Sequence, residues 1–338
     1  MGEPLRSVES CGSPVPAGRG TDGMIQGGAV LTFTFLFVAL IPFVGPLVLI
    51  LTPLPILYYS SRLGRLRGLT VLAFSILAAY VILDLAAHRA NLSVLFMIGF
   101  TGVLLSEVLK RNFSVEKTLL LASSALFCCG AAFVLYHAFR SGIAPWRMVE
   151  THVARVIEEN IKLYAQMNIS DEQVQMIRES APQLTLFFAG IFPALGLSGI
   201  ALTVWVNLLA GRRLFQASGV AFPDFGDLAA WKAPERLVWI VIIAGGMLFV
   251  PLEGITTVGM NLLIVSGLIY LLQGLAIAAF FFRQKQVPKM FRLLFYGLIL
   301  VQQYMLIVII AFGLFDMWVD FRKRIKEVKD NIHNPKFG

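Results

Sequence analysis

Long apolar runs are the feature of this sequence that most restricts its fold. A helix needs about 20 consecutive, mostly apolar residues to cross a bilayer, and runs near that length recur along the whole chain. Only 14% of the residues are charged, whereas a soluble domain has about 25%. Because so little polar surface cannot shield the apolar side chains from water, we expect an all-α, polytopic transmembrane helix bundle.

Nine apolar segments are separated by prolines, glycines and charged residues. The segments are 24–41, 47–59, 69–86, 92–109, 118–139, 184–210, 237–252, 256–282 and 291–318. We therefore expect about eight to nine membrane helices. The second segment contains Pro53 and Pro55, and proline interrupts helical hydrogen bonding. Such irregular backbone must be covered inside a membrane, so we expect a short, kinked helix in the bundle interior.

The net charge of +8 comes mostly from basic residues in short stretches between the apolar runs. One stretch, "SSRLGRLRG", holds Arg62, Arg65 and Arg67. Cytoplasmic loops of membrane proteins are enriched in arginine and lysine. The pattern therefore predicts a multi-pass protein of the bacterial cytoplasmic (inner) membrane, with the lipid bilayer as its surroundings and no nucleic acid as partner.

The basic C-terminal tail conflicts with this topology. Nine crossings that begin inside would leave the tail outside, although its arginines and lysines should keep it inside. Two alternatives remain open: a re-entrant stretch near Gln302 and Gln303, or a tail that is an exception to the charge rule.

Residues 144–181 differ from the apolar segments because charged and apolar positions alternate with helical spacing. This pattern predicts an amphipathic, extramembrane helical hairpin. Ser170 and Gln173 have the spacing of a capping box, so a short second helix should start there and lead into the sixth segment. The hairpin would be either a surface linker or a lid over the mouth of the bundle.

These patterns predict five regions in the chain. They are a flexible N-terminal tail (1–23), a six-helix membrane bundle that includes the amphipathic insert (24–210), a cytoplasmic loop (211–236), C-terminal membrane helices (237–319) and a charged tail (320–338).

No stretch of the sequence has the spacing of a catalytic site. There is no phosphate-binding G-x-x-x-x-G-K-[ST] pattern, and the four histidines are scattered. Ser198 lies in "GLSG", but the only later histidine is His333 in the polar tail, so the serine lacks the base that it would need as a nucleophile. We expect no enzyme activity, no catalytic residues, no metal site and no cofactor.

Polar side chains inside apolar segments are costly in lipid and often mark function. The strongest candidates for ligand-binding residues or for polar residues within the bundle are Asn207, Asn261, Gln273, Gln302 and Asp316. Two interpretations remain open. The side chains form hydrogen bonds between helices, or they line a ligand site or pathway.

"GMNLLIVSGLIYLLQGLAIAAFFFR", "AFGLFDMWVDFRKR" and "WKAPERLVW" together resemble the YybS-like predicted membrane proteins, known as domain of unknown function 2232. The resemblance covers roughly residues 24–325 and implies a membrane protein without a settled activity. Besides Asn261, Gln273 and Asp316, the residues that carry it are Trp231, Pro234, Gly274, Gly313, Trp318, Asp320 and Arg322.

Residues 24–210 also resemble the substrate-binding S components of energy-coupling-factor importers, mainly through "PLPILYYSSRLGRLRGL". That resemblance implies a vitamin-like small-molecule ligand, with separate ATPase and scaffold subunits as partners. The A-x-x-x-A docking pattern of those proteins is absent, because Thr32 and Phe33 stand four residues after Gly28 and Ala29.

Two functional hypotheses follow. The first is a small-molecule-binding component of a transport system. The second is a non-transporting membrane scaffold or assembly factor that acts through the loop 211–236 and the tail.

Overall fold

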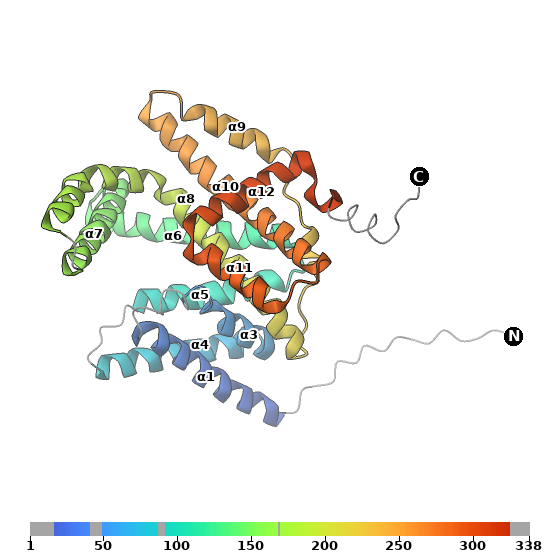
Figure 1. The fold of residues 1–338 in the computed structure, drawn as a ribbon. Helices are drawn as coiled ribbons and strands as arrows, with labels where there is room; N and C mark the ends of the chain where they lie inside the picture. The colour runs from blue at the N-terminus through green and yellow to red at the C-terminus, as the bar shows by residue number, and fades with distance from the viewer. Residues whose placement is uncertain (1–16, 41–48, 87–91, 168–169, 325–338) are drawn as a thin grey trace, which may run out of the picture. The chain divides into compact units, whose positions relative to one another are not determined.

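The computed structural model describes residues 17–40, 49–86, 92–167 and 170–324. Within these ranges the regular secondary structure is entirely helical (Figure 1), which confirms the expected all-α fold. The helices are α1 (Ala17–Leu40), α3 (Pro53–Leu63), α4 (Arg65–Leu85), α5 (Leu92–Leu109), α6 (Val115–Ser141), α7 (Pro145–Gln166), α8 (Asp171–Ala217), the 3₁₀ helix η1 (Leu228–Ala230), α9 (Leu237–Met247), α10 (Glu253–Gln284), α11 (Lys289–Val301) and α12 (Gln303–Val319).

Six described helices are long and apolar enough to cross a membrane: α1, α4, α5, α6, α8 and α10. The number becomes seven if α11 and α12 are taken as one broken span, so the expected eight to nine crossings are not confirmed. The seventh predicted segment is α9, whose 11 residues extend only about 17 Å. Large apolar side chains cover the outside of the long helices, as lipid contact requires; Phe96, Leu120 and Phe139 are 67%, 70% and 89% exposed.

The two prolines of the second segment lie in the first turn of a helix. Pro53 is the first residue of α3, and Pro55 lies in the same turn. The first N–H groups of a helix have no intrahelical partner, so proline fits there without the loss of a hydrogen bond. The expectation of a short helix is confirmed by the 11 residues of α3, whereas the predicted kink also depends on residues 47 and 48, which lie outside the described residues.

The basic stretch at 62–67 is a tight corner between helices, where we expected a loop. Arg62 lies in the last turn of α3 and Arg65 begins α4, so only Gly64 separates the two helices. Gly64 has φ 83° and ψ 171°, a conformation that is essentially restricted to glycine. The corner therefore depends on the missing side chain at position 64.

The amphipathic helix is confirmed as α7, with Val153 and Ile161 buried. The Ser170 hydroxyl accepts a hydrogen bond from the Gln173 N–H at 3.4 Å, as the predicted cap requires. However, the helix that starts there is not short. It continues through Pro182 and Pro193 as the 47-residue α8, which merges the predicted second helix of the hairpin with the sixth segment.

Two boundaries in the structure differ from the predicted ones. The N-terminal tail should end at residue 23, but α1 already begins at Ala17. The loop expected from residue 211 begins at 218, because α8 continues to Ala217. There Gly219 adopts φ 65° and the Val220 N–H reaches back to the Phe215 carbonyl at 3.0 Å. This is a Schellman ending.

Two compact units divide the chain, and their limits differ from the predicted regions. The first consists of Met1–Ala122 and Thr203–Pro223, and the second of Ser123–Leu202 and Asp224–Gly338. In the first unit α1, α3, α4 and α5 pack around a core that includes Leu31, Phe35 and Ile56. In the second unit α10 packs against α9, η1 and α12.

Candidate functional site: a buried polar clasp in the second unit

Two glycines let the backbones of α10 and α12 touch. A Cβ atom built on Gly274 would overlap the Ile309 carbonyl oxygen, and one on Gly313 would overlap the Tyr270 carbonyl oxygen. Small residues permit such close crossings of membrane helices. The crossing brings Gln273 on α10 next to Asp316 on α12.

The Asp316 carboxylate is the centre of the site, with only 1% of the residue exposed. Its Oδ2 atom accepts a hydrogen bond from Gln273 Nε2 at 3.0 Å and lies 3.5 Å from Arg322 Nη1. Its Oδ1 atom accepts a hydrogen bond from the Phe321 N–H at 3.0 Å. These partners are reachable because α12 ends at Val319, and the left-handed φ of 42° at Asp320 turns the chain back towards Asp316.

The same side chains hold the loop that precedes α9. The Ala233 N–H donates to Gln273 Oε1 at 3.1 Å. Arg322 Nη2 donates to the Trp231 carbonyl oxygen at 2.8 Å. We call the side chains of Gln273, Asp316 and Arg322, with the loop backbone at 231–233, the polar clasp.

Two outer ion pairs fasten the same loop. Lys232 Nζ lies 3.1 Å from Asp320 Oδ1, and both side chains are about half exposed. Arg283 binds Asp227 with two hydrogen bonds, of 2.9 and 2.6 Å. The loop is therefore attached to α10 at Arg283 and at Gln273, and to the end of α12 at Asp320.

Burial and charge have opposite effects on the pKa values at the end of α12. Burial lowers the pKa of Arg322, because it disfavours the charged guanidinium, and Asp316 and Asp320 offset part of this effect. Burial alone would raise the pKa of Asp320, but the hydrogen bond from Lys232 and the nearby positive charges lower it overall. The Nε atom of Arg322 is buried and has no hydrogen-bond partner within the described residues.

Asn261 lies outside the clasp and binds the backbone of α8 on both sides of Pro193. Its Oδ1 atom accepts from the Ala194 N–H at 3.0 Å, and its Nδ2 atom donates to the Gly190 carbonyl at 2.8 Å. In a regular helix these two backbone groups pair with each other. Pro193 lies between them and has no N–H to donate, and the Asn261 amide supplies a partner to both groups.

Asn207 has a similar role in the first unit. It is fully buried, and its Nδ2 atom donates to the carbonyls of Ile50 at 2.6 Å and Thr203 at 2.7 Å. Ile50 lies just before α3, where Pro53 and Pro55 remove N–H donors from the first turn. The Oδ1 atom of Asn207 has no hydrogen-bond partner within the described residues.

The structure does not bring the remaining candidates into the clasp. Gln302 is exposed at the break between α11 and α12. Trp318 is 60% exposed. Pro234 is exposed, and its carbonyl accepts from the Leu237 N–H at the start of α9.

Sequence reasoning missed several members of the site. Asp227, Lys232 and Arg283 looked like ordinary charges of polar stretches. Asp227 had a local signal, because its carboxylate caps η1 by accepting from the Ala229 N–H at 3.2 Å. The carbonyl of Trp231 and the N–H of Ala233 had none, because every residue type carries such backbone groups.

The clasp is built to hold a loop. The oxygens of Asp316 and Gln273 accept hydrogen bonds from donors of the protein itself. Across the residues that the structure describes, no group of three or more histidine, cysteine, aspartate or glutamate side chains could hold a metal ion. Of the two interpretations of the buried amides, the observed contacts match hydrogen bonding within the bundle.

Comparison with known proteins agrees with the membrane fold. The family described as "Predicted membrane protein (DUF2232)" matches residues 29–317. The uncharacterized protein YybS of Bacillus subtilis (strain 168) is 22% identical over 319 residues, which cover 89% of this chain and 98% of YybS. No solved structure matches, and a resemblance to energy-coupling-factor S components is not shown. With its apolar helices and a family match over most of its length, this chain is a multi-pass membrane protein that belongs to the DUF2232 family.

Proposed function

We propose that this protein is a non-enzymatic membrane scaffold, which presents the loop 218–236 and the segment after α12 to a partner protein. The clasp is the observation that supports this function, because it fixes the loop by two part-buried hydrogen bonds and two ion pairs. A surface that is ordered before binding saves the entropy of ordering on association. Glu235 and Arg236 are exposed in this loop and suit contact with a polar partner.

We place the protein in the bacterial cytoplasmic membrane, with this loop on the cytoplasmic side. Arg212 and Arg213 just before the loop, with Lys232 and Arg236 within it, support that orientation. The relative from Bacillus subtilis supports a bacterial setting. The partner would then be a cytoplasmic protein or the cytoplasmic part of another membrane protein.

Site-specific photo-crosslinking in cells tests the scaffold. A photoreactive amino acid at Glu235 should give a discrete crosslinked protein band, and Arg322→Ala should remove that band because the loop loses its buried anchor. The same amino acid at Leu163, which is 57% exposed on α7, is the matched control and should give no such band. Identical products from positions 235 and 163, or none from 235, would contradict the scaffold.

A small-molecule-binding component of a transport system is the second candidate. A groove of about 910 Å³ between α1 and α4 in the first unit favours it, and side chains such as Met24, Phe33 and Phe74 line that groove. Its apolar walls suit an apolar molecule. Thermal shifts with a vitamin panel, mass spectrometry of retained ligands and recovery of an ATPase subunit would support this candidate. If all three experiments gave negative results, the transport candidate would be excluded, and the crosslinking test of the scaffold would be unaffected.

A further inference from the structure

Neither α11 nor α12 is long enough to cross a bilayer alone. Their 13 and 17 residues extend only about 20 and 26 Å, against about 30 Å of hydrocarbon. The chain bends by 109° between them, where Gln302 has an extended backbone. The pair is therefore either one broken crossing or a hairpin that leaves the membrane on the face where it entered.

The ion pairs of the loop before α9 decide between these two topologies. Half-exposed ion pairs are costly in hydrocarbon, so Arg283–Asp227 and Lys232–Asp320 should both lie at a water-facing surface. Asp227 and Lys232 are five residues apart, and five residues extend at most about 18 Å. Because this is shorter than the hydrocarbon thickness, both pairs lie on one face of the membrane.

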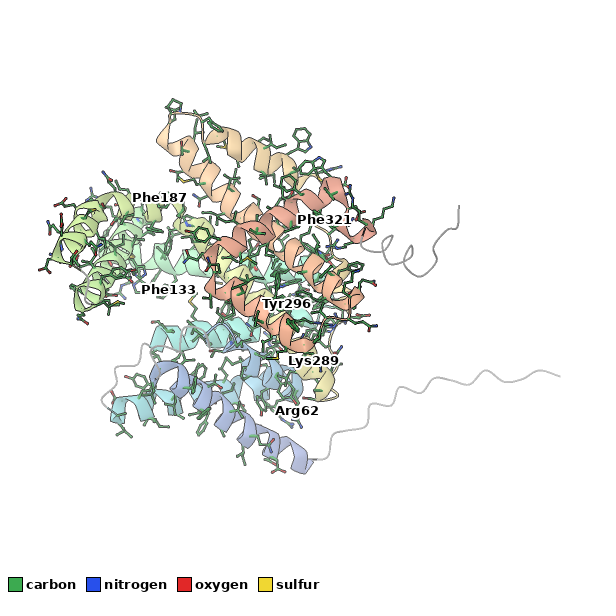
Figure 2. All side chains as sticks on the ribbon, viewed as in Figure 1. Arg62, Phe133, Phe187, Lys289, Tyr296 and Phe321 are labelled. Atoms are coloured by element: carbon green, nitrogen blue, oxygen red, sulfur yellow. The ribbon has the colours of Figure 1, made fainter. Side chains whose placement is uncertain are left out.

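The two ends of the α11–α12 pair must then share that face. Arg283 lies at the end of α10, and α11 starts at Lys289, six residues later. Asp320 directly follows α12. Lys289 and Phe321, labelled in Figure 2, mark the two ends of this hairpin.

An apolar cavity lies between the hairpin and α10. Its volume is about 360 Å³, and apolar residues of all three helices line it, among them Ala278 on α10, Phe295 on α11 and Val308 on α12. This volume is within the range of about 300–1,000 Å³ that is usual for ligand sites. The walls offer shape and apolar contact, which suits a hydrocarbon chain.

Basic residues lie close in sequence to Phe282, one of the residues that line this cavity. Phe282 lines the cavity, and its carbonyl accepts a hydrogen bond from Arg292 Nη2 at 3.1 Å. Lys285 and Lys289 are exposed nearby in sequence, and neither side chain has a partner within the described residues. No aspartate or glutamate occurs from residue 284 to 315. The carboxylates of Asp227, Asp316 and Asp320 are each paired with a basic side chain, so the remaining positive charge at this end attracts an anion.

We propose that α11 and α12 form a re-entrant hairpin on the face of the loop 218–236, and that its cavity holds one acyl chain of an anionic phospholipid whose headgroup lies at Lys285 and Lys289. This site is independent of the scaffold surface proposed above.

Cysteine labelling tests the topology in the full-length protein, after Cys11, Cys128 and Cys129 are replaced by serine. Single cysteines at Glu235, Gln286 and Arg324 should react with a membrane-impermeant maleimide from the same face of oriented vesicles. A cysteine at Glu159 on α7 serves as a reference for the opposite face. Labelling of position 324 from the face opposite to 286 would overturn the hairpin.

Native mass spectrometry tests the lipid site on protein purified in mild detergent. Wild-type protein should retain about one phosphatidylglycerol, and after delipidation it should rebind phosphatidylglycerol at least tenfold more tightly than phosphatidylcholine with the same chains. Ala278→Phe fills the cavity and should lower this affinity at least tenfold. Ala279→Phe, on the same helix but outside the lining, should keep it.

Further variants keep the lipid test independent of folding. If Ala278→Phe lowers the melting temperature, Val308→Phe fills the cavity from the opposite wall. Lys285→Gln with Lys289→Gln should abolish the preference for the anionic lipid, whereas Arg213→Gln with Arg236→Gln should not. Equal binding by wild type and both cavity-filling variants, or no preference for the anionic lipid, would overturn the site.

Discussion

Asp316 shows how one buried carboxylate can order the ends of several elements. It binds an amide of α10, the backbone after α12 and the guanidinium of Arg322. Charge-assisted hydrogen bonds are stronger than neutral ones. However, the cost of burying each charge is offset only while its partner of opposite charge is present. Removal of one charge therefore leaves the opposite charge buried and unpaired.

Asp316→Ala should destabilise the protein by about 3–5 kcal/mol, because Arg322 would remain buried without its counter-ion. Steric-trapping or denaturant unfolding in detergent measures the change in the free energy of unfolding. Asp84→Ala removes an exposed carboxylate and should have little effect.

The double variant Asp316→Leu with Arg322→Leu should be less destabilised than Asp316→Ala, since apolar replacement of a buried pair costs less than breaking it. A double variant as unstable as the sum of the two single variants would contradict the pairing.

Asn261→Ala should cost about 1–3 kcal/mol, because the Ala194 N–H and the Gly190 carbonyl lose a partner inside the bundle. Pro193→Ala in the same chain should recover part of this loss, since a regular helix pairs the two groups itself. A double-mutant cycle of unfolding free energies measures the coupling, and strictly additive effects would show that Asn261 does not serve the proline break.

At the scale of helices, contact between α10 and α12 depends on two missing side chains. A single methyl group at Gly274 or Gly313 would meet a backbone carbonyl of the other helix. Backbone carbonyls cannot rotate away as side chains do, so the helices would have to separate. Separation would also draw Gln273 away from Asp316.

Gly313→Ala should therefore lower the melting temperature strongly and weaken the clasp. Gly267→Ala is the matched control on α10, because the new methyl group would only touch the end of the Ile310 side chain at 3.9 Å. It should be neutral or stabilising, since alanine favours helix over glycine. Thermal unfolding in detergent measures both variants, and equal effects would contradict the close crossing.

Apolar length predicted uninterrupted helices well and broken ones poorly. The segment expected at 92–109 is α5, with the same first and last residues. The segment at 291–318 is apolar almost throughout, so its composition does not reveal the break at Gln302. The suggestion of a re-entrant stretch near Gln302 came from charge balance, and the bend lies at that residue.

The candidate site was only partly predictable for a similar reason. The cost of polar groups in lipid identified Gln273 and Asp316, and the family resemblance added Gly274, Gly313 and Arg322. The arrangement required the fold, because the clasp joins residues 40 to 91 positions apart in the sequence. Its partners in the loop are backbone atoms, and no residue type in the sequence indicates which backbone atoms will bind.

For the molecule as a whole, the clasp should control how accessible the loop 218–236 is. Arg322→Ala should speed tryptic cleavage after Lys232 and Arg236, because the loop would open locally without its buried anchor. Cleavage after Lys110 and Arg111, in the first unit, should stay unchanged and is the control. Mass spectrometry of limited digests measures both rates, and a loop equally resistant in the variant would contradict the anchoring role.

The first unit consists of two stretches of chain with Ser123–Leu202 between them, and this order affects how the protein is made. The Ile50 carbonyl leaves the ribosome 157 residues before its partner Asn207. At roughly 5–20 residues per second, the wait is about 8–30 seconds. During translation, the nascent first unit must therefore persist in the membrane with its last helix still unsynthesised.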